Sequence, residues 1–448
     1  MSIELIAVVM FGTMLVLLMT GLPLTFVLGA TGAGALILFR GIDALIVPLL
    51  TLWGLTNTFI FVAVPLFILM GVVLERSGVS ENLFQVMYIW AGSVKGGLAI
   101  GIVIVCILFA AMCGTSGAAT VSLGLIAIPP MLKREYDTTL VTGTIQAGGA
   151  LGFLIPPSVM MIIYGMIGKV SVGRLYAAGL FPGLLLASLY IAYIGVRCLI
   201  QPKLGPAMPP EERQFTLIQK LAYTRLAVLP VLLIVTVLGS MFTGMASPTE
   251  ASAVGVAGAL ILAAVHRRMS FTMLKEAMFR STRIMGMVMW VALSAIVFSA
   301  AFDYFGGAKL IEKLFLSLQL GPWGILILIQ LSFFVLGSFL EDTGILFITL
   351  PIYIPIVIAQ GIDPIWFGTL FVMNMQMAYL TPPFGLNLFY MKGVVADLYN
   401  SGDIRKLISM AEIYRSIIPY VLLQAVGLAL VMVFPQIALW LPNKLFGS

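Results

Sequence analysis

Hydroxyl and carboxylate side chains in two interruptions of apolar sequence are the best candidates for chemistry in this chain. The first interruption, CGTSGAATVSLG at 113–124, combines flexible backbone with hydroxyl oxygens at Gly114, Thr115 and Ser116. The second, GSFLEDTGILF at 337–347, places two carboxylates and a hydroxyl in an apolar stretch, at Glu341, Asp342 and Thr343. Charges inside a membrane segment are costly and usually functional. The two stretches therefore predict a binding site, with simple helix capping by Glu341 or Asp342 as the alternative.

A third feature, GFLIPPSVMMIIYG at 152–165, is apolar enough for a membrane helix but contains two adjacent prolines. Each proline removes a backbone donor and clashes with the preceding turn. Hydrocarbon offers no water to replace the lost hydrogen bonds. A simple kink is one interpretation. The other is a functional break, at which freed carbonyls coordinate a cation and a half-helix N-terminus faces an anion.

An internal repeat favours the functional break. A shift of 226 positions places AYLTPPFGLNLFYM at 378–391 on the first broken segment, so that its two prolines coincide with Pro382 and Pro383. The same shift aligns three more identical pairs, which are Tyr164 with Tyr390, Asp137 with Asp363, and Pro129 with Pro355. Paired, proline-interrupted segments in two halves of a chain indicate the midplane site of a secondary transporter. The chain is therefore predicted to be duplicated, with its halves in opposite orientations.

Composition places the repeat in a membrane. Hydrophobic residues make up 61% of the 448 residues and charged residues only 9%, whereas a soluble domain has about a quarter of its residues charged. The predicted fold is an all-α polytopic membrane protein, built from two inverted-topology repeats with re-entrant helical hairpins and broken helices. A re-entrant hairpin is tolerated only where protein or a water-filled cavity surrounds it. The three cysteines are too widely spaced for a disulfide framework.

Apolar stretches of span length recur along the chain. They are 3–20, 22–39, 59–74, 98–112, 139–167, 175–200, 225–243, 247–265, 284–302, 322–340, 343–360, 365–380 and 413–434. The first of them lacks the basic n-region and cleavage site of a signal peptide, so we expect a retained helix. Basic residues gather in 201–225 and 266–283, which predicts that both segments lie on the cytoplasmic face. The periodicity of the second segment predicts an interfacial helix that joins the two halves.

An intramembrane enzyme is the main alternative class, and the residues argue against it. His266 is the only histidine, so neither an HExxH metal site nor a histidine-based triad is possible. The stretch GMIGKVS at 165–171 has no Ser or Thr after Lys169, which excludes a P-loop. We therefore expect no enzymatic activity, and an ion gradient or another subunit as the energy source.

Several long motifs resemble the large membrane subunit of the tripartite ATP-independent periplasmic (TRAP) transporters, the DctM-like family. They are VAVPLFILMGVVLERSG at 62–78, GTIQAGGALGFLIPPSVMMIIYG at 143–165, AGLFPGLLLA at 178–187, ASPTEASAVG at 246–255 and GIDPIWFGTLFVMNMQMAYLTPPFGLNLFYMKG at 361–393. The resemblance implies a bacterial inner-membrane, elevator-type transporter that takes up organic acids with a sodium gradient, Na⁺ being a coupling ion. It also implies two partners, a separate small four-helix membrane subunit and a soluble periplasmic substrate-binding protein; no nucleic acid is expected.

The resemblance also implies two sodium sites. The first matches Gly114, Thr115, Ser116, Gly152, Ile155 and Pro156, and the second matches Gly337, Asp342, Thr343, Leu380, Thr381 and Pro382. Substrate contacts are expected from Ser116, Pro157, Ser158, Tyr164, Glu341, Pro383 and Asn387. A proton gradient that acts through Glu341 or Asp342 is the competing driver.

The expected domain plan alternates scaffold and transport elements. Scaffold helices are expected at 1–95, at 176–300 together with the cytoplasmic connector, and at 411–448. The two transport-domain halves, each a hairpin plus a broken helix, are expected at 96–175 and 301–410. The main alternative function is a stand-alone sodium/dicarboxylate symporter of similar architecture, and an ion channel is a more distant one.

Overall fold

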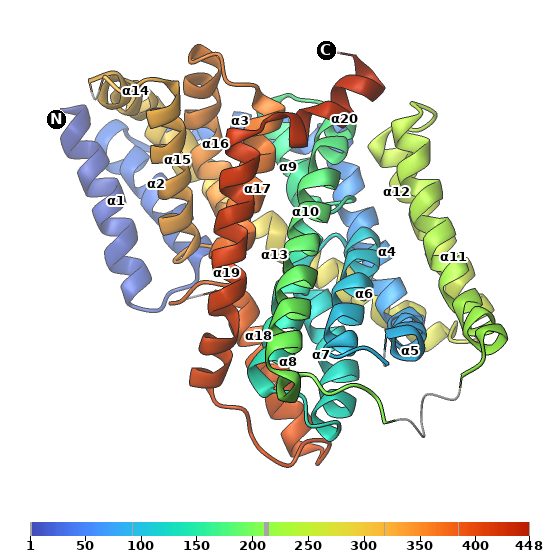
Figure 1. Cartoon of the computed structure of the whole chain (residues 1–448). Coiled ribbons are helices and arrows are strands. Elements are labelled where there is room, and N and C mark those ends of the chain that lie inside the picture. Colours follow the sequence, from blue (N-terminus) through green and yellow to red (C-terminus); the bar gives the residue numbers. More distant parts are fainter. Residues whose placement is uncertain (1, 92, 210–214, 318, 384, 448) are drawn as a thin grey trace.

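The computed structural model describes the chain except residues 1, 92, 210–214, 318, 384 and 448 (Figure 1). Every regular element in the described part is helical, which confirms the all-α prediction. Eight of its helices are long and apolar enough to cross a membrane. The chain is thus a multi-pass membrane protein, and several shorter apolar helices complete the assembly around the spans.

The elements of the N-terminal half, up to the first break, are α1 (Ile3–Met19), α2 (Leu24–Arg40), η1 (Ile42–Leu45), α3 (Ile46–Thr56), η2 (Phe59–Val62), α4 (Ala63–Arg76), α5 (Val79–Ala91), α6 (Gly97–Cys113), α7 (Ser116–Lys133), α8 (Thr138–Ala150) and η3 (Leu151–Phe153). The middle elements are α9 (Val159–Gly168), α10 (Val172–Ile200), η4 (Pro202–Leu204), α11 (Leu217–Phe242), α12 (Pro248–Val265) and α13 (Phe271–Tyr304). The C-terminal elements are α14 (Gly307–Ser317), α15 (Pro322–Gly337), α16 (Asp342–Ala359), α17 (Pro364–Ala378), α18 (Leu386–Asn400), α19 (Met410–Val433) and α20 (Gln436–Phe446).

The predicted repeat is present in the helix boundaries. Helices α7 and α16 both have 18 residues, and their first residues, Ser116 and Asp342, are related by the 226-residue shift. Helices α8 and α17 begin at equivalent positions, each after an aspartate whose side chain accepts hydrogen bonds from first-turn N–H groups, Asp137 in one half and Asp363 in the other. The aligned aspartates are therefore N-caps that start equivalent helices.

The two halves are inverted. Helices α6 and α7 form a hairpin in the lower part of Figure 1, whereas α15 and α16 form one in the upper part. Helices α8 and α17, which follow the hairpins, supply the core: every residue from Leu140 to Ala150 and from Ile365 to Ala378 is buried. The first repeat thus enters the molecule from the opposite side to the second, as the sequence predicts.

Both predicted breaks are present where the Pro-Pro pairs lie. Helix α8 passes through η3 into an irregular segment before α9 starts at Val159, and α17 ends at Ala378 before α18 starts at Leu386. The Pro156–Pro157 and Pro382–Pro383 peptide bonds are both cis. The half-helices α9 and α18 therefore begin inside the protein, where the Val159 N–H donates to the Gly114 carbonyl and the Asn387 N–H donates to the Tyr379 carbonyl.

The basic segments lie at one end of the molecule, but the predicted connector is wrong in one respect. Helices α11 and α12 form an antiparallel pair, so the segments before α11 and after α12 share the lower end of Figure 1; residues 210–214 of the first segment lie outside the described residues. The expected interfacial helix is instead the start of α13, which continues without a break for 34 residues. No proline separates the basic turns from the apolar ones, so the helix continues.

Candidate cation and substrate site

The tip of the first hairpin packs against the first break through backbone. Gly114 has a φ of +64°, a conformation that favours glycine. A Cβ atom on Gly114 would lie 2.6 Å from the Pro157 carbonyl oxygen, and one on Gly152 would lie 2.9 Å from the Thr115 carbonyl oxygen. The structure therefore brings together four residues that the sequence places in the first site and beside it.

Two carbonyls at this break are available to a ligand. Ile155 and Pro156 are buried, and no N–H or O–H group within the described ranges donates to their carbonyl oxygens. Buried carbonyls normally find a partner, and unwound carbonyls of broken helices are typical sodium ligands in transporters. The first break thus offers acceptors of the kind that a cation binds.

Ser116 is held by the second half of the chain. Its Oγ donates to Asn387 Oδ1 at 3.0 Å, and the hydroxyl of Thr120 donates to the same oxygen at 3.3 Å. Asn387 Nδ2 in turn donates to the Gln146 carbonyl at 3.1 Å. Because the Ser116 hydroxyl donates its hydrogen bond to Asn387, both lone pairs of Oγ remain available to a cation.

The tip of the second hairpin has a carboxylate at the equivalent position. Asp342 Oδ1 accepts from the Thr343 N–H at 2.7 Å and from the Thr343 hydroxyl at 3.3 Å. Glu341 occupies the N-cap position of α16, but its side chain makes no capping bond. Asp342 therefore caps its own helix end, and its other carboxylate oxygen accepts no hydrogen bond in the described part of the chain.

At the second break, Thr381 makes hydrogen bonds within its own segment. Thr381 Oγ1 donates to the Met377 carbonyl at 2.9 Å, and its own carbonyl accepts from the Gly385 N–H at 3.1 Å. Leu380 is buried, whereas Pro382 and Pro383 are exposed. Gly337 does reach the break, because a Cβ atom there would lie 2.5 Å from the Ala378 side chain.

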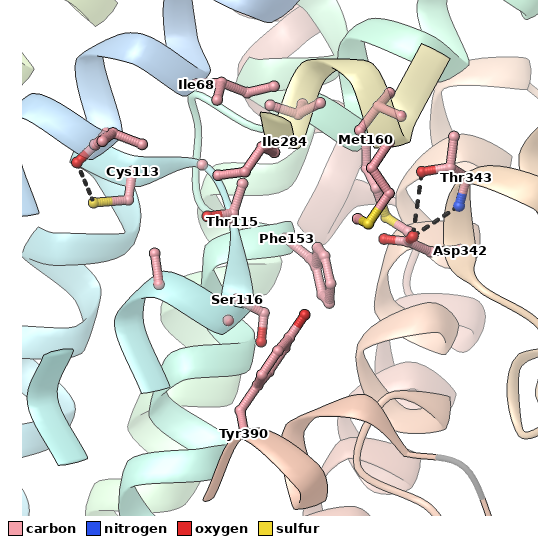
Figure 2. A pocket seen from close by; sticks show the side chains of 18 of the residues that line it. Ile68, Cys113, Thr115, Ser116, Phe153, Met160, Ile284, Asp342, Thr343 and Tyr390 are labelled. Atoms are coloured by element: carbon pink, nitrogen blue, oxygen red, sulfur yellow. Dashed lines mark hydrogen bonds between the residues drawn. The ribbon is translucent and has the colours of Figure 1, made fainter. Parts of the chain in front are cut away.

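One cavity of about 470 Å³ joins the two hairpin tips. Figure 2 shows Thr115 and Ser116 on one side of it and Asp342 and Thr343 on the other, with Phe153 between them. The remaining hairpin and break residues that line it include Gly114, Gly117, Glu341, Tyr379 and Tyr390. The opposite wall comes from α4 and α13. The described cavity is thus bounded by both repeats and by two helices outside them.

Five of the seven expected substrate contacts do not line this cavity. Ser158 is buried and donates to the Phe153 carbonyl, Tyr164 donates to the Pro364 carbonyl at 2.7 Å, and Asn387 is fully buried behind Ser116. Pro157 and Pro383 are not among the lining residues either, whereas Ser116 and Glu341 are. Tyr390, the repeat equivalent of Tyr164, does line the cavity and packs against Gly117.

Sequence reasoning missed the charged rim of the cavity. Glu75 on α4 and Arg280 on α13 form an ion pair at 2.9 Å, and Arg283 lies one turn farther along α13. In the sequence, the charge of the two arginines predicts only a cytoplasmic location. Arg280 precedes Ile284 by four residues and Arg283 precedes Met287 by four, a spacing that places each arginine on one helix face with an apolar lining residue.

The chain is similar to known transport proteins along almost its whole length. Residues 11–437 match the family "Tripartite ATP-independent periplasmic transporter, DctM component". The C4-dicarboxylate TRAP transporter large permease protein DctM of Pseudomonas aeruginosa is 32% identical over 419 residues, covering 93% of this chain and 94% of that protein.

Two further relatives are named for other substrates. The ectoine/5-hydroxyectoine TRAP transporter large permease protein UehC of Ruegeria pomeroyi is 30% identical, covering 99% of this chain and 100% of that protein. The sialic acid TRAP transporter large permease protein SiaM of Vibrio cholerae is 30% identical, covering 96% and 97%.

The fold has a counterpart of known structure. The YdaH transporter of Alcanivorax borkumensis superposes with a TM-score of 0.62 at 16% identity, covering 89% of this chain and 90% of that one. That protein's crystal structure is described as having an unusual topology. As a member of this family, the protein is a transport protein of the inner membrane and not an enzyme, and it works with a small membrane subunit and a periplasmic binding protein. With a family match over 11–437 and a permease relative at 32% identity, the chain belongs to the DctM component family of the TRAP transporters.

Proposed function

We propose that the chain is a sodium-coupled importer of an organic acid, which it receives from the periplasmic binding protein and moves by an elevator-type mechanism. The observation that carries the proposal is the shared cavity. Two inverted hairpins bring oxygen-rich tips to opposite sides of a single space, beside two broken helices. This is the arrangement in which secondary transporters bind a substrate and its coupling ions.

Sodium fits the donor groups on both sides. The first side offers the Ser116 hydroxyl and the buried carbonyls of Ile155 and Pro156, and the second offers the Asp342 carboxylate. These are neutral or anionic oxygens, and the described chain places no cluster of three His, Cys, Asp or Glu residues that suits a transition metal. Gly152, Leu380, Thr381 and Pro382 would complete the two sites through backbone or hydroxyl oxygens.

The substrate is an anion in this proposal. The substrates in the names of the relatives above, C4-dicarboxylates, ectoines and sialic acid, all carry a carboxylate group. A bound cation and the N-termini of α7 and α16 supply positive potential at the hairpin tips. The cavity of about 470 Å³ is large enough for a small organic acid.

The alternating movement would divide the chain as the sequence suggests. Residues 96–175 and 301–410 would move as the transport domain, against a scaffold that includes α4 and α13. The cavity reaches the basic, predicted cytoplasmic end through Arg280 and Arg283, so this conformation would be the inward-facing one. A separate four-helix membrane subunit would pack on the scaffold.

Reconstitution tests the coupling directly. The chain, its small subunit and its binding protein are placed in liposomes, and uptake of succinate, ectoine or N-acetylneuraminate is measured with an inward sodium gradient. We expect uptake of at least one of these acids that needs both sodium and the binding protein. Uptake that persists without sodium overturns the coupling.

The same liposomes separate the alternatives. A stand-alone sodium/dicarboxylate symporter would transport without the binding protein, because it takes substrate from solution. A proton-driven carrier that uses Glu341 or Asp342 would respond to an imposed pH gradient in potassium buffer. Each alternative therefore gives a result that the tripartite, sodium-driven mechanism does not.

A further inference from the structure

The cavity wall opposite the hairpins is formed by one face of α4 and one face of α13. From α4 it includes Ile68, Gly71, Val72 and Glu75. From α13 it includes Arg280, Arg283, Ile284, Met287 and Val288. Both sets have the i, i+3, i+4, i+7 spacing of a single helix face. On each helix the charged residues lie toward the predicted cytoplasmic end, and the apolar ones lie deeper.

The charges on this wall do not balance. Glu75 is largely buried and pairs with Arg280 at 2.9 Å, so these two cancel. Arg283 lies about 4.5 Å farther along α13, one helical turn, and no carboxylate in the described part of the chain pairs with it. The wall therefore presents one uncompensated guanidinium to the cavity.

The surroundings of Arg283 suit an anion. Across the cavity lie the Tyr390 hydroxyl, which can donate to an anion, and the carboxyl groups of Glu341 and Asp342, whose charge a bound sodium ion would offset. A guanidinium binds a carboxylate through two parallel N–H···O bonds. The Arg283 side chain is exposed at the cavity rim, so an anion that enters the cavity can reach it.

We propose that Arg283 is the scaffold's contact for the substrate carboxylate, and that Glu75 keeps Arg280 from competing for it. This inference rests on the proposed function, since it concerns the same cavity. The carboxylate leaves the hairpin tips, pairs with Arg283 and then passes to the cytoplasm. Because Arg283 belongs to α13 and not to a hairpin, it meets the substrate only when the hairpins lie beside it.

Charged thiol reagents test the anion site without knowledge of the substrate. Ala118 lines the cavity on α7 and is partly exposed, so Ala118→Cys is introduced after Cys106, Cys113 and Cys198 are replaced by Ala. Inside-out vesicles are treated with the anionic 2-sulfonatoethyl and the cationic 2-(trimethylammonium)ethyl methanethiosulfonates. The ratio of the anionic to the cationic labelling rate reports the local potential.

We expect Arg283→Gln to lower this ratio about tenfold, Arg283→Lys to preserve most of it, and Glu75→Gln to raise it by freeing Arg280. Lys275→Gln is the matched control, because Lys275 is exposed on the same helix but does not line the cavity. An unchanged ratio in Arg283→Gln, or an equal fall in Lys275→Gln, overturns the inference. Since labelling needs neither sodium nor binding protein, its failure is distinct from a failure of sodium-coupled uptake.

Discussion

The two halves of this protein share a backbone plan and differ in the chemistry at the hairpin tips. Helices α7 and α16 begin at equivalent positions, but the first residue is Ser116 in one half and Asp342 in the other. A hydroxyl is a neutral ligand, whereas a carboxylate adds a full charge. The two hairpin tips therefore have the same backbone position but unequal charge.

The halves also differ in how completely each break is covered. Helix α10 packs on the first break, where a Cβ atom on Gly183 would lie 2.6 Å from the Ile155 side chain, and the first Pro-Pro pair is buried. The second pair is exposed, and Thr381 bonds within its own segment. The first break is thus covered by protein in this conformation, whereas the second Pro-Pro pair is exposed.

The largest effect is expected at the first hairpin tip. Gly114→Ala puts a side chain at positive φ, costing about 1–2 kcal/mol, and drives a Cβ atom against the Pro157 carbonyl, costing about 1–3 kcal/mol more. Gly361→Ala is the control, because Gly361 also has positive φ but nothing within 4 Å of the added Cβ. Thermal unfolding in detergent should show a clearly larger fall for Gly114→Ala. Equal falls would mean that the tip is not tightly packed.

A second, smaller effect tests the contact between hairpin and break in the other half. The equivalent of Gly152 is Ala378, and the equivalent of Ala111 is Gly337, so the smaller residue changes sides between the halves. Gly337→Ala should destabilise by about 1–3 kcal/mol through overlap with Ala378. The double variant with Ala378→Gly should recover most of this loss. Absence of recovery would place the damage elsewhere than in this contact.

Unequal ligands should give unequal sodium dependence. We expect Asp342→Asn and Thr381→Ala each to raise the sodium concentration for half-maximal uptake about tenfold, or about 1.4 kcal/mol, and Ser116→Ala to raise it less. Membrane-inserted protein should change little.

Simple helix capping by Asp342 makes the opposite forecast. In that case Asp342→Asn is nearly silent in uptake, and Asp342→Ala lowers the melting temperature without moving the sodium curve. Measuring uptake against sodium concentration alongside melting temperature separates the two roles.

The smallest effect distinguishes the paired tyrosines. Tyr164→Phe removes the hydrogen bond to the Pro364 carbonyl and should cost about 0.5–1.5 kcal/mol of stability. Tyr390→Phe should cost less stability than Tyr164→Phe but slow uptake, because the hydroxyl that it removes belongs to a residue that lines the cavity. Melting temperature and uptake rate are measured on both variants. The melting temperature should fall mainly in Tyr164→Phe, and the uptake rate should fall mainly in Tyr390→Phe. A stability loss in Tyr390→Phe as large as in Tyr164→Phe would contradict this division.

The sequence by itself determined the membrane class, the duplication, the breaks and the hairpin tips. Each depends on a local signal, such as two prolines in an apolar run or a carboxylate where hydrocarbon forbids one, that acts within a few residues. The sequence did not predict the short helices α3, α5, α14 and α20, because none of them has the length of a membrane span. The sequence did not predict the continuity of α13, because basic residues and apolar residues both form helix readily and no signal marks a boundary between them.

Only the tertiary structure decided which of these residues face the same space. Tyr164 and Tyr390 are identical in the sequence pattern, yet one is buried against Pro364 and the other lines the cavity. Asn387, expected at the substrate, lies behind Ser116. Glu75, Arg280 and Arg283 line a wall of the cavity that no sequence motif predicted. A local pattern fixes where a helix starts or breaks, but burial and pairing depend on neighbours that are 200 or more residues away in the chain.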